Sequence, residues 1–478
     1  GVTMKKNVIV LFIIMVLGMT AWRTNAQHGD QQRYYWPEDP LVLEKLAWWQ
    51  DLKFGLLMHW GPYSQWGVVE SWSLCPEDEE WCVRRGPYSH DYYEYRNAYE
   101  NLQQTFNPEK FNPQKWADAA EKAGMKYMIF TTKHHDGFSM FDTQLTDYKI
   151  TSEKCPFSGN PKSNITNEVF KAFREKGMGI GAYFSKPDWH CPDYWDPYFP
   201  PIDRNVNYDI KKYPEKWQRY KDFTWGQISE LLTGYGKVDI LWLDGGWVEK
   251  GRDTVYGNGK RIVNQDIDMS GLAAMARTLQ PGILVVDRAV EGPNQNYLTP
   301  EQRVPEKLLN FPWETCMTMG NSWSYVPGDF YKSSDELIRL LCRIVARGGN
   351  FLLNIGPGPD GEWDPAAYSR LEEIGAWMKV NGEGIYASKP SVPYEKDGFV
   401  YTQNGDYLYA IYLTDHSTVT ASLKVSLPEG YGRKPVVLGW KGSAAGSVKA
   451  GELIIPVTGK LRKAMESTPA LVFRFKKG

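Results

Sequence analysis

The feature that most constrains the fold is a repeated alternation of apolar, β-prone segments with segments of helical periodicity. The expected strands cover residues 54–58, 126–133, 179–185, 238–243, 283–286 and 350–355. The expected helices cover residues 41–52, 113–123, 167–176, 215–233, 271–279, 333–346 and 365–380. A succession of strand-then-helix units predicts a parallel sheet, and this number of units over this length favours a (β/α)8-like barrel. A doubly wound sheet is the alternative, but no glycine-rich phosphate turn follows an early strand.

The C-terminal part of the chain has a different texture from about Gly384 onward. Short alternating or β-rich runs are separated there by Gly, Pro, Asp and Ser, at residues 407–412, 422–427, 436–438, 453–455 and 471–475. This pattern predicts a C-terminal antiparallel β-sandwich. We therefore expect a barrel domain over residues 27–383 and a sandwich domain over residues 384–478.

The N-terminus resembles a bacterial secretory signal peptide over residues 4–26. Lys5 and Lys6 precede an apolar run over residues 8–19, and small residues lead to a cleavage site near Ala26/Gln27. The run is shorter than the roughly 20 residues that a membrane span needs. We expect a periplasmic or secreted mature chain without membrane insertion. Six cysteines would then meet an oxidising compartment, where Cys75 and Cys82 are the nearest possible pair, although buried thiols fit equally well.

Composition narrows the classes of partner. A net charge of -2 with 23% charged residues shows no basic footprint for nucleic acid and none for a membrane surface. Aromatic residues make up 14% of the chain. Trp and Tyr suit the C–H faces of sugars, but they also fill protein cores, so composition alone does not separate the two uses.

Polar and ionisable residues stand at the ends of five expected strands. They are His59, His134, His135, Tyr183, Ser185, Asp244 and Arg288. In a parallel barrel these ends converge on the C-terminal mouth, where barrel enzymes bind their ligands. An isolated Asp-Gly such as Asp244-Gly245 is more typical of a turn. The whole set at one end of the barrel favours a functional site.

One chemistry that fits these residues is glycoside hydrolysis, which needs two carboxylates flanking a sugar. Asp244 is the candidate nucleophile, because a carboxylate at a strand end is held on rigid backbone. Its partner, the acid that protonates the leaving oxygen, is expected on a later loop. The candidates are Glu291, Glu301, Glu306 and Glu314.

A second chemistry is that of a metal-dependent barrel hydrolase. Its ligands would be His59, His134, His135 and Asp244. Adjacent His134 and His135 would point to opposite faces of an extended strand, which disfavours a shared ion unless a loop turns them together.

The motifs jointly resemble those of the α-L-fucosidases of glycoside hydrolase family 29. The similar stretches are FGLLMHWG (54–61), Glu70-Ser71-Trp72, KHHDGF (133–138), WLDG (242–245), Asp287-Arg288, Trp313-Glu314-Thr315 and Ser322-Trp323. They occur in this order over about residues 41–380. The short stretch Leu-Asp-Gly alone would mean little, whereas the ordered set is specific.

The resemblance implies a retaining exo-acting hydrolase that removes terminal α-L-fucosyl residues from an oligosaccharide or glycoconjugate, with no metal and no cofactor. Asp244 would be the nucleophile and Glu301, in Thr299-Pro300-Glu301, the acid/base, with Glu314 as runner-up. The residues implied to hold the sugar hydroxyls are His59, Glu70, Trp72, His134, His135 and Arg288. Those implied to pack on the ring and its C5 methyl are Tyr183, Trp242 and Trp323. An inactive fucose-binding protein is a further alternative, and neither the linkage cleaved nor the oligomeric state follows from these motifs.

Overall fold

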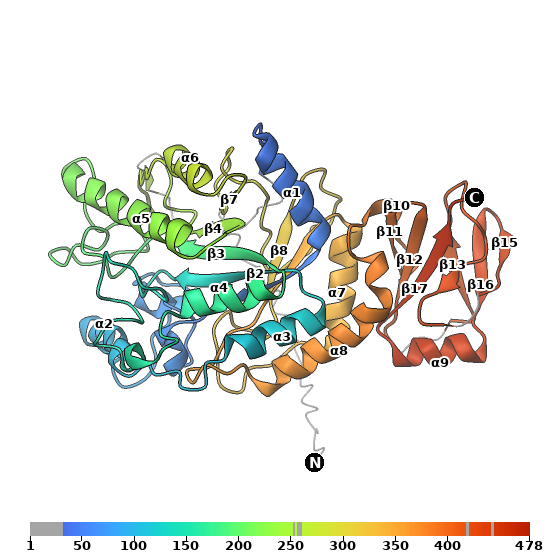
Figure 1. Ribbon diagram of the computed structural model, residues 1–478, viewed down its shortest axis with the longest axis horizontal. Coiled ribbons are helices and arrows are strands. Elements are labelled where there is room, and N and C mark those ends of the chain that lie inside the picture. Colours follow the sequence, from blue (N-terminus) through green and yellow to red (C-terminus); the bar gives the residue numbers. More distant parts are fainter. Residues whose placement is uncertain (1–31, 252–253, 256–260, 417–419, 441–443) are drawn as a thin grey trace, which may run out of the picture.

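The computed structural model describes residues 32–251, 254–255, 261–416, 420–440 and 444–478. The signal peptide predicted over residues 4–26 lies outside these residues. Within them, no helix combines the length and the apolar character that crossing a membrane requires. Figure 1 shows a curled sheet surrounded by helices, with a β-rich region on the far side of α7 (Ser334–Ala346) and α8 (Pro365–Asn381).

The curled sheet has seven parallel strands in the order β7-β4-β3-β2-β1-β9-β8. Their bounds are β1 (Phe54–Met58), β2 (Tyr127–Lys133), β3 (Gly179–Ser185), β4 (Ile240–Asp244), β7 (Leu284–Asp287), β8 (Glu314–Thr318) and β9 (Asn350–Asn354). Almost every residue of these strands is buried, as expected for parallel strands covered on both faces. The predicted barrel with its parallel sheet is therefore confirmed.

The barrel has seven regular strands rather than eight among the residues that the structure describes. β7 and β8 are the edges of the sheet, and the irregular segment 295–301 lies between them. Isolated bridges join this segment to both sides, from Val286 to Gln295, from Leu298 to Trp313 and from Glu301 to Cys316. Segment 295–301 thus takes the place of a strand and carries Glu301 to the level of Cys316 in β8.

Helices pack around the outside of this sheet (Figure 1). Besides α7 and α8 they are α1 (Pro40–Leu52), α3 (Pro113–Ala123), α4 (Ile165–Glu175), α5 (Pro214–Gly234) and α6 (Met269–Leu279), while α2 (Tyr92–Glu100) belongs to the long connection after β1. Three helices begin with proline after a capping side chain, from Asp39, Asn112 or Asp364. These signals made the helix starts readable in the sequence.

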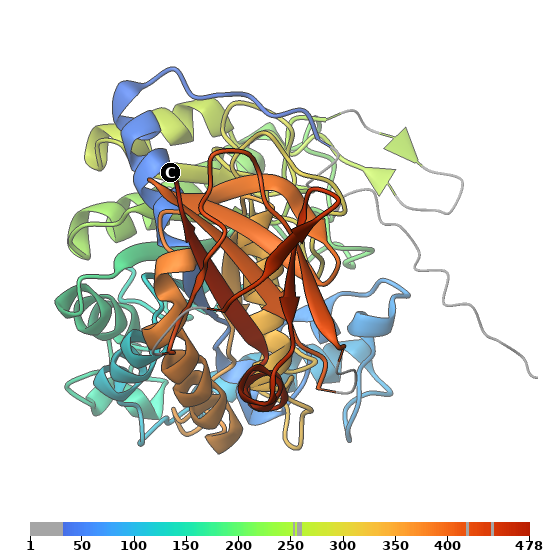
Figure 2. The same ribbon diagram turned by 90° about the vertical axis from the view of Figure 1, so that its right-hand side faces the viewer.

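The C-terminal region contains two antiparallel sheets that share one core. A five-stranded sheet has the order β10-β11-β12-β17-β14, and a three-stranded sheet has the order β13-β16-β15. The elements are β10 (Lys389–Lys396), β11 (Phe399–Asn404), β12 (Tyr407–Leu413), β13 (Ser422–Ser426), β14 (Val436–Val437), β15 (Ser447–Lys449), β16 (Glu452–Pro456), α9 (Gly459–Ser467) and β17 (Ala470–Lys476). Figure 2 shows these sheets in front of the barrel. The indole N–H of Trp377 in α8 donates to the Ala470 carbonyl at 3.0 Å, which anchors this region to the barrel helices.

Candidate active site

Asp244 is the last residue of β4 and lies at the C-terminal mouth of the barrel. The Tyr183 hydroxyl donates to Asp244 Oδ2 at 2.7 Å, and Arg288 Nη1 donates to Oδ1 at 3.1 Å. Burial alone would raise the pKa of Asp244, but the Arg288 charge and the Tyr183 hydrogen bond hold this pKa well below its usual range. Asp244 is therefore an ionised carboxylate whose side chain is 16% exposed at the mouth.

Arg288 contacts a second carboxylate. Its Nη2 donates a short hydrogen bond to Glu301 Oε2, and the side chains of Arg288 and Glu301 are as little exposed as that of Asp244. One guanidinium thus lies between Asp244 and Glu301, with one amino group on each. Two carboxylates at the mouth, held by the same cation, are a suitable pair for chemistry at a sugar carbon.

His59 and His134 are each fixed through Nδ1. His59 Nδ1 lies 2.8 Å from Asn354 Oδ1. Because the amide nitrogen of Asn354 donates to the Trp323 carbonyl, Oδ1 is the acceptor and the imidazole Nδ1–H is the donor. His134 Nδ1 lies 2.6 Å from the Ser71 hydroxyl. Burial lowers the pKa of His59 to about 4 and that of His134 well below its usual value. Both rings are neutral hydrogen-bonding groups near pH 7.

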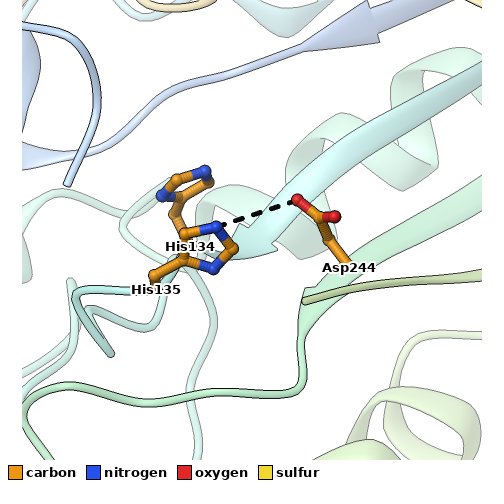
Figure 3. A group of neighbouring side chains, drawn as sticks. All are labelled: His134, His135 and Asp244. Atoms are coloured by element: carbon orange, nitrogen blue, oxygen red, sulfur yellow. Dashed lines mark ion pairs between the residues drawn. The ribbon is translucent and has the colours of Figure 1, made fainter. Parts of the chain in front are cut away.

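His135 approaches Asp244 most closely of the three histidines. Its Nδ1 shares a 2.6 Å hydrogen bond with the Ser185 hydroxyl, and its Nε2 lies 3.9 Å from Asp244 Oδ2 (Figure 3). Burial lowers the pKa of His135 to about 3, although Asp244 acts in the opposite direction. A neutral His135 therefore presents Nε2 to the space beside Asp244.

The two adjacent histidines do not point to opposite faces, as an extended strand would require. β2 ends at Lys133, and the turn that follows brings the rings of His134 and His135 to 4.1 Å between centroids (Figure 3). One ligand atom each from His134, His135 and Asp244 lies within 4.8 Å of the others. Because Arg288 already places a positive charge against Asp244, a metal cation there would meet electrostatic repulsion.

Glu70 lies beside the histidines on the connection after β1. Its Oε1 accepts a 2.8 Å hydrogen bond from the Ser324 N–H, and its side chain is buried. Burial raises the pKa of Glu70 to about 8, and the nearby carboxylates of Glu301 and Asp244 act in the same direction. Near neutral pH Glu70 is mostly protonated, so it offers both a donor and an acceptor to a sugar hydroxyl.

The three aromatic residues expected around the sugar ring differ in exposure. Trp242 is 1% exposed and lies beneath the Arg288 guanidinium, whose Cζ is 5.0 Å from the ring centroid. Tyr183 is fully buried and uses its hydroxyl on Asp244. Trp323 is only partly buried, and its ring centroid is 5.2 Å from that of His59. Of the three, Trp323 has the indole surface available to a ligand.

Glu314 occupies a different level of the barrel. It is the first residue of β8, two residues before Cys316, and is therefore roughly 6.6 Å deeper than the level of Glu301. Its carboxylate is fully buried and accepts hydrogen bonds from the Tyr127 hydroxyl at 2.6 Å and the Trp242 indole N–H at 3.3 Å. Burial raises the pKa of Glu314 to about 7. The side chain supports the ring beneath Arg288 and does not line the mouth.

Glu314→Gln is expected to stabilise the protein at alkaline pH. Because the folded state raises the pKa of Glu314 from 4.5 to about 7, the contribution of Glu314 to stability is fully present below pH 4.5 and is lost as pH rises through about 7. A neutral amide removes this loss, which amounts to about 3 kcal/mol above pH 7. Urea unfolding of the wild type and the variant at pH 5 and pH 8 measures it, with exposed Glu306→Gln as the control. An equal difference between wild type and variant at both pH values would contradict the buried, titrating carboxyl.

Sequence reasoning missed several residues that hold the site. Asn354 ends β9, so the same strand-end argument that selected His59 would have found it. Ser71 and Ser324 adjoin Trp72 and Trp323, but a serine gives no signal of its own. Trp247 and Trp189, whose rings contact His135, are indistinguishable in sequence from core tryptophans.

Comparisons with known proteins identify the family of this chain. The model of the Alpha-L-fucosidase family matches residues 21–383. Human tissue alpha-L-fucosidase is 29% identical over 420 residues, which cover 84% of this chain and 83% of the human protein. The structure of alpha-L-fucosidase isoenzyme 1 from Paenibacillus thiaminolyticus is similar with a TM-score of 0.73 and 29% identity, covering 92% of this chain and 100% of that chain. The structure of the alpha-fucosidase of Thermotoga maritima in complex with fucose is similar with a TM-score of 0.69 and 25% identity, covering 92% of this chain and 100% of that chain. The chain described here belongs to the α-L-fucosidase family.

Proposed function

We propose that this chain is a retaining exo-α-L-fucosidase that releases terminal α-L-fucosyl residues from oligosaccharides or glycoconjugates by double displacement. The observation that carries the proposal is the Arg288 guanidinium, which contacts both Asp244 and Glu301 at the barrel mouth. This shared contact holds the two carboxyl groups at one place in the mouth, where one can act as nucleophile and the other as acid/base on the same sugar.

The first displacement begins with ionised Asp244, whose carboxylate attacks the anomeric carbon. The bond from that carbon to the glycosidic oxygen breaks, and Glu301 gives its proton to the departing oxygen. In the second displacement Glu301 takes a proton from water, the water oxygen bonds to the anomeric carbon, and the bond to Asp244 breaks. Two inversions release fucose with the configuration of the substrate.

Glu301 must change partner during this cycle. The acid must reach the departing oxygen to give up its proton, whereas Glu301 here contacts Arg288 Nη2. We propose that a bound fucosyl group separates Glu301 from Arg288 and leaves Arg288 on Asp244. The same guanidinium would then be free to donate from Nη2 to a sugar hydroxyl.

Recognition of fucose would use the neutral groups around Asp244. His59, His134 and His135 would hydrogen-bond hydroxyls through Nε2, with Glu70 and Trp72 beside them. Trp323 is the aromatic with exposed surface for the C5 methyl, where other hexoses carry a hydroxymethyl that would lose its hydrogen bonds on entering an apolar pocket. That a relative, the Thermotoga maritima alpha-fucosidase, binds fucose supports this ligand. The basic and apolar sequence over residues 4–26 supports action in the periplasm or outside the cell.

The proposal is tested by the anomer that appears first. With 4-nitrophenyl α-L-fucoside as substrate, proton NMR should show α-L-fucose before mutarotation produces the β anomer. A panel of fucosylated oligosaccharides of different linkage, run beside it, identifies the preferred aglycone. First appearance of β-L-fucose would contradict the retaining mechanism. Binding of fucose without turnover would instead favour the inactive binding protein, and activity lost on exhaustive chelation and restored by a divalent cation would favour the metal-dependent hydrolase.

A further inference from the structure

Arg204 joins two loops above the barrel mouth. It lies in the connection between β3 and α5, and its guanidinium forms a two-pronged ion pair with Glu77 from the connection after β1. Arg204 Nε donates to Glu77 Oε1 and Nη2 donates to Oε2, both at 2.6 Å. The Arg204 backbone N–H adds a hydrogen bond to Oε1 at 3.1 Å. Such paired geometry fixes the direction of the guanidinium as well as its position.

The same arginine contacts three tryptophans. Its Cζ lies 4.9 Å from the ring centroid of Trp72 and 5.2 Å from that of Trp247, distances typical of cation–π contacts. Its carbonyl oxygen accepts from the indole N–H groups of Trp247 and Trp189, each at 3.1 Å. One residue thus orients three rings that come from three different connections of the barrel.

These three rings enclose His135. Their centroids lie 5.1, 5.1 and 5.2 Å from the imidazole centroid, for Trp72, Trp247 and Trp189 respectively. The Trp189 backbone N–H also donates to the His135 carbonyl at 2.7 Å. His135 therefore has indole on three sides and the Ser185 hydroxyl at Nδ1, and Nε2 is directed toward Asp244.

We propose that Arg204, held by Glu77, is a positioning residue that sets the direction in which His135 presents Nε2 to one hydroxyl of the substrate. The inference rests on the proposed function, because it assigns to His135 a hydroxyl of the bound fucosyl group. Arginine suits this role better than lysine, since only a planar guanidinium stacks on indole faces and binds both oxygens of Glu77 at once. Loss of the guanidinium would leave His135 in place but remove the cation that restrains the rings of Trp72 and Trp247.

Arg204→Met is the direct test, with 4-nitrophenyl α-L-fucoside and its 2-, 3- and 4-deoxy analogues as substrates. The variant His135→Ala first identifies the hydroxyl that His135 binds. The deoxy analogue that lacks this hydroxyl is the one whose kcat/KM falls least in His135→Ala. Arg204→Met should lower kcat/KM for the parent fucoside on the order of 10- to 100-fold and spare the same analogue. Arg204→Lys should restore little, because it lacks the planar fork. Glu77→Gln should act in the same direction with a smaller effect, and it serves as the test if Arg204→Met does not fold.

The neighbouring residue supplies a matched control. Asp203, next to Arg204 in the same loop, pairs at 2.9 Å with Arg261 of the connection after β4 rather than with the residues around His135. Asp203→Asn should therefore leave kcat/KM for all four substrates nearly unchanged. An equal loss on all four substrates in Arg204→Met, or no loss in either Arg204→Met or Glu77→Gln, would overturn the inference. Failure of the wild type to hydrolyse the parent fucoside would instead reject the proposed function, so the two failures are distinguishable.

Discussion

Asp244→Gly is expected to lower hydrolysis of an aryl α-L-fucoside on the order of 10⁴-fold, and sodium azide is expected to restore part of the rate. The substitution removes the carboxylate that would attack the anomeric carbon and leaves space in which azide fits. Because azide then performs one displacement instead of two, the product should be β-L-fucosyl azide. Initial rates with and without azide, together with NMR of the product, measure both effects.

A control for this variant lies at the opposite end of β4. Asp239, just before the other end of β4, is buried and pairs with Lys45 at 2.6 Å, far from the mouth. Asp239→Asn should therefore affect stability rather than turnover, and azide should not change its rate. An Asp244→Gly enzyme that remains active without azide would reject Asp244 as the nucleophile.

The barrel could be predicted from sequence because its strands are short apolar runs between well-capped helices. The strands that lack such an apolar run were not predicted. β8 escaped notice because Glu314–Thr318 holds two polar threonines and a glutamate within five residues. β10 carries Pro390 and Pro393, which a central strand would not tolerate but the edge of a sheet does. Segment 295–301 fills the gap between β7 and β8 through isolated bridges. Such bridges need no regular alternation of apolar residues, so the sequence pattern does not predict them.

The residues at the mouth were predictable for a related reason. In a parallel barrel, strand ends are neighbours in space even when they are far apart in sequence, so His59, Asp244 and Arg288 converge. The Arg288 contact with both carboxylates was not predictable, since it depends on how segment 295–301 turns. The depth of Glu314 in the barrel was not evident either, because the sequence does not show at which residue the loop ends and β8 begins.

The charges of the site separate two kinds of group. Asp244 keeps its negative charge despite burial because Arg288 and Tyr183 compensate for lost solvation, whereas the attraction of Asp244 does not offset the burial of the three imidazoles. Neutral histidines do not compete with Arg288 for Asp244, and they leave its carboxylate as the nucleophile near pH 7. The site thereby combines the Asp244–Arg288 ion pair with an uncharged wall suited to hydroxyl groups.

Glu301→Ala is expected to discriminate sharply between leaving groups. For fucosyl oligosaccharides, whose departing alcohol needs a proton, kcat/KM should fall on the order of 10²- to 10⁴-fold. For 2,4-dinitrophenyl α-L-fucoside, whose dinitrophenolate leaving group needs no proton, kcat/KM should change little. The value of kcat should fall, because water then attacks the fucosyl-enzyme without a base. Azide needs no base, so it should raise kcat and yield α-L-fucosyl azide after two displacements. Steady-state kinetics on both substrate classes and NMR of the azide product measure these effects.

The anomer of the azide product makes the two carboxylates distinguishable in one assay. Loss of Asp244 leaves a single displacement and the β product, whereas loss of Glu301 leaves both displacements and the α product. Glu314→Gln is the matched control, because its buried carboxylate contacts Tyr127 and Trp242 and should have no part in leaving-group protonation. If Glu314→Gln, and not Glu301→Ala, showed the leaving-group dependence and the α azide, the acid/base would be Glu314, and the barrel interior would have to open during catalysis.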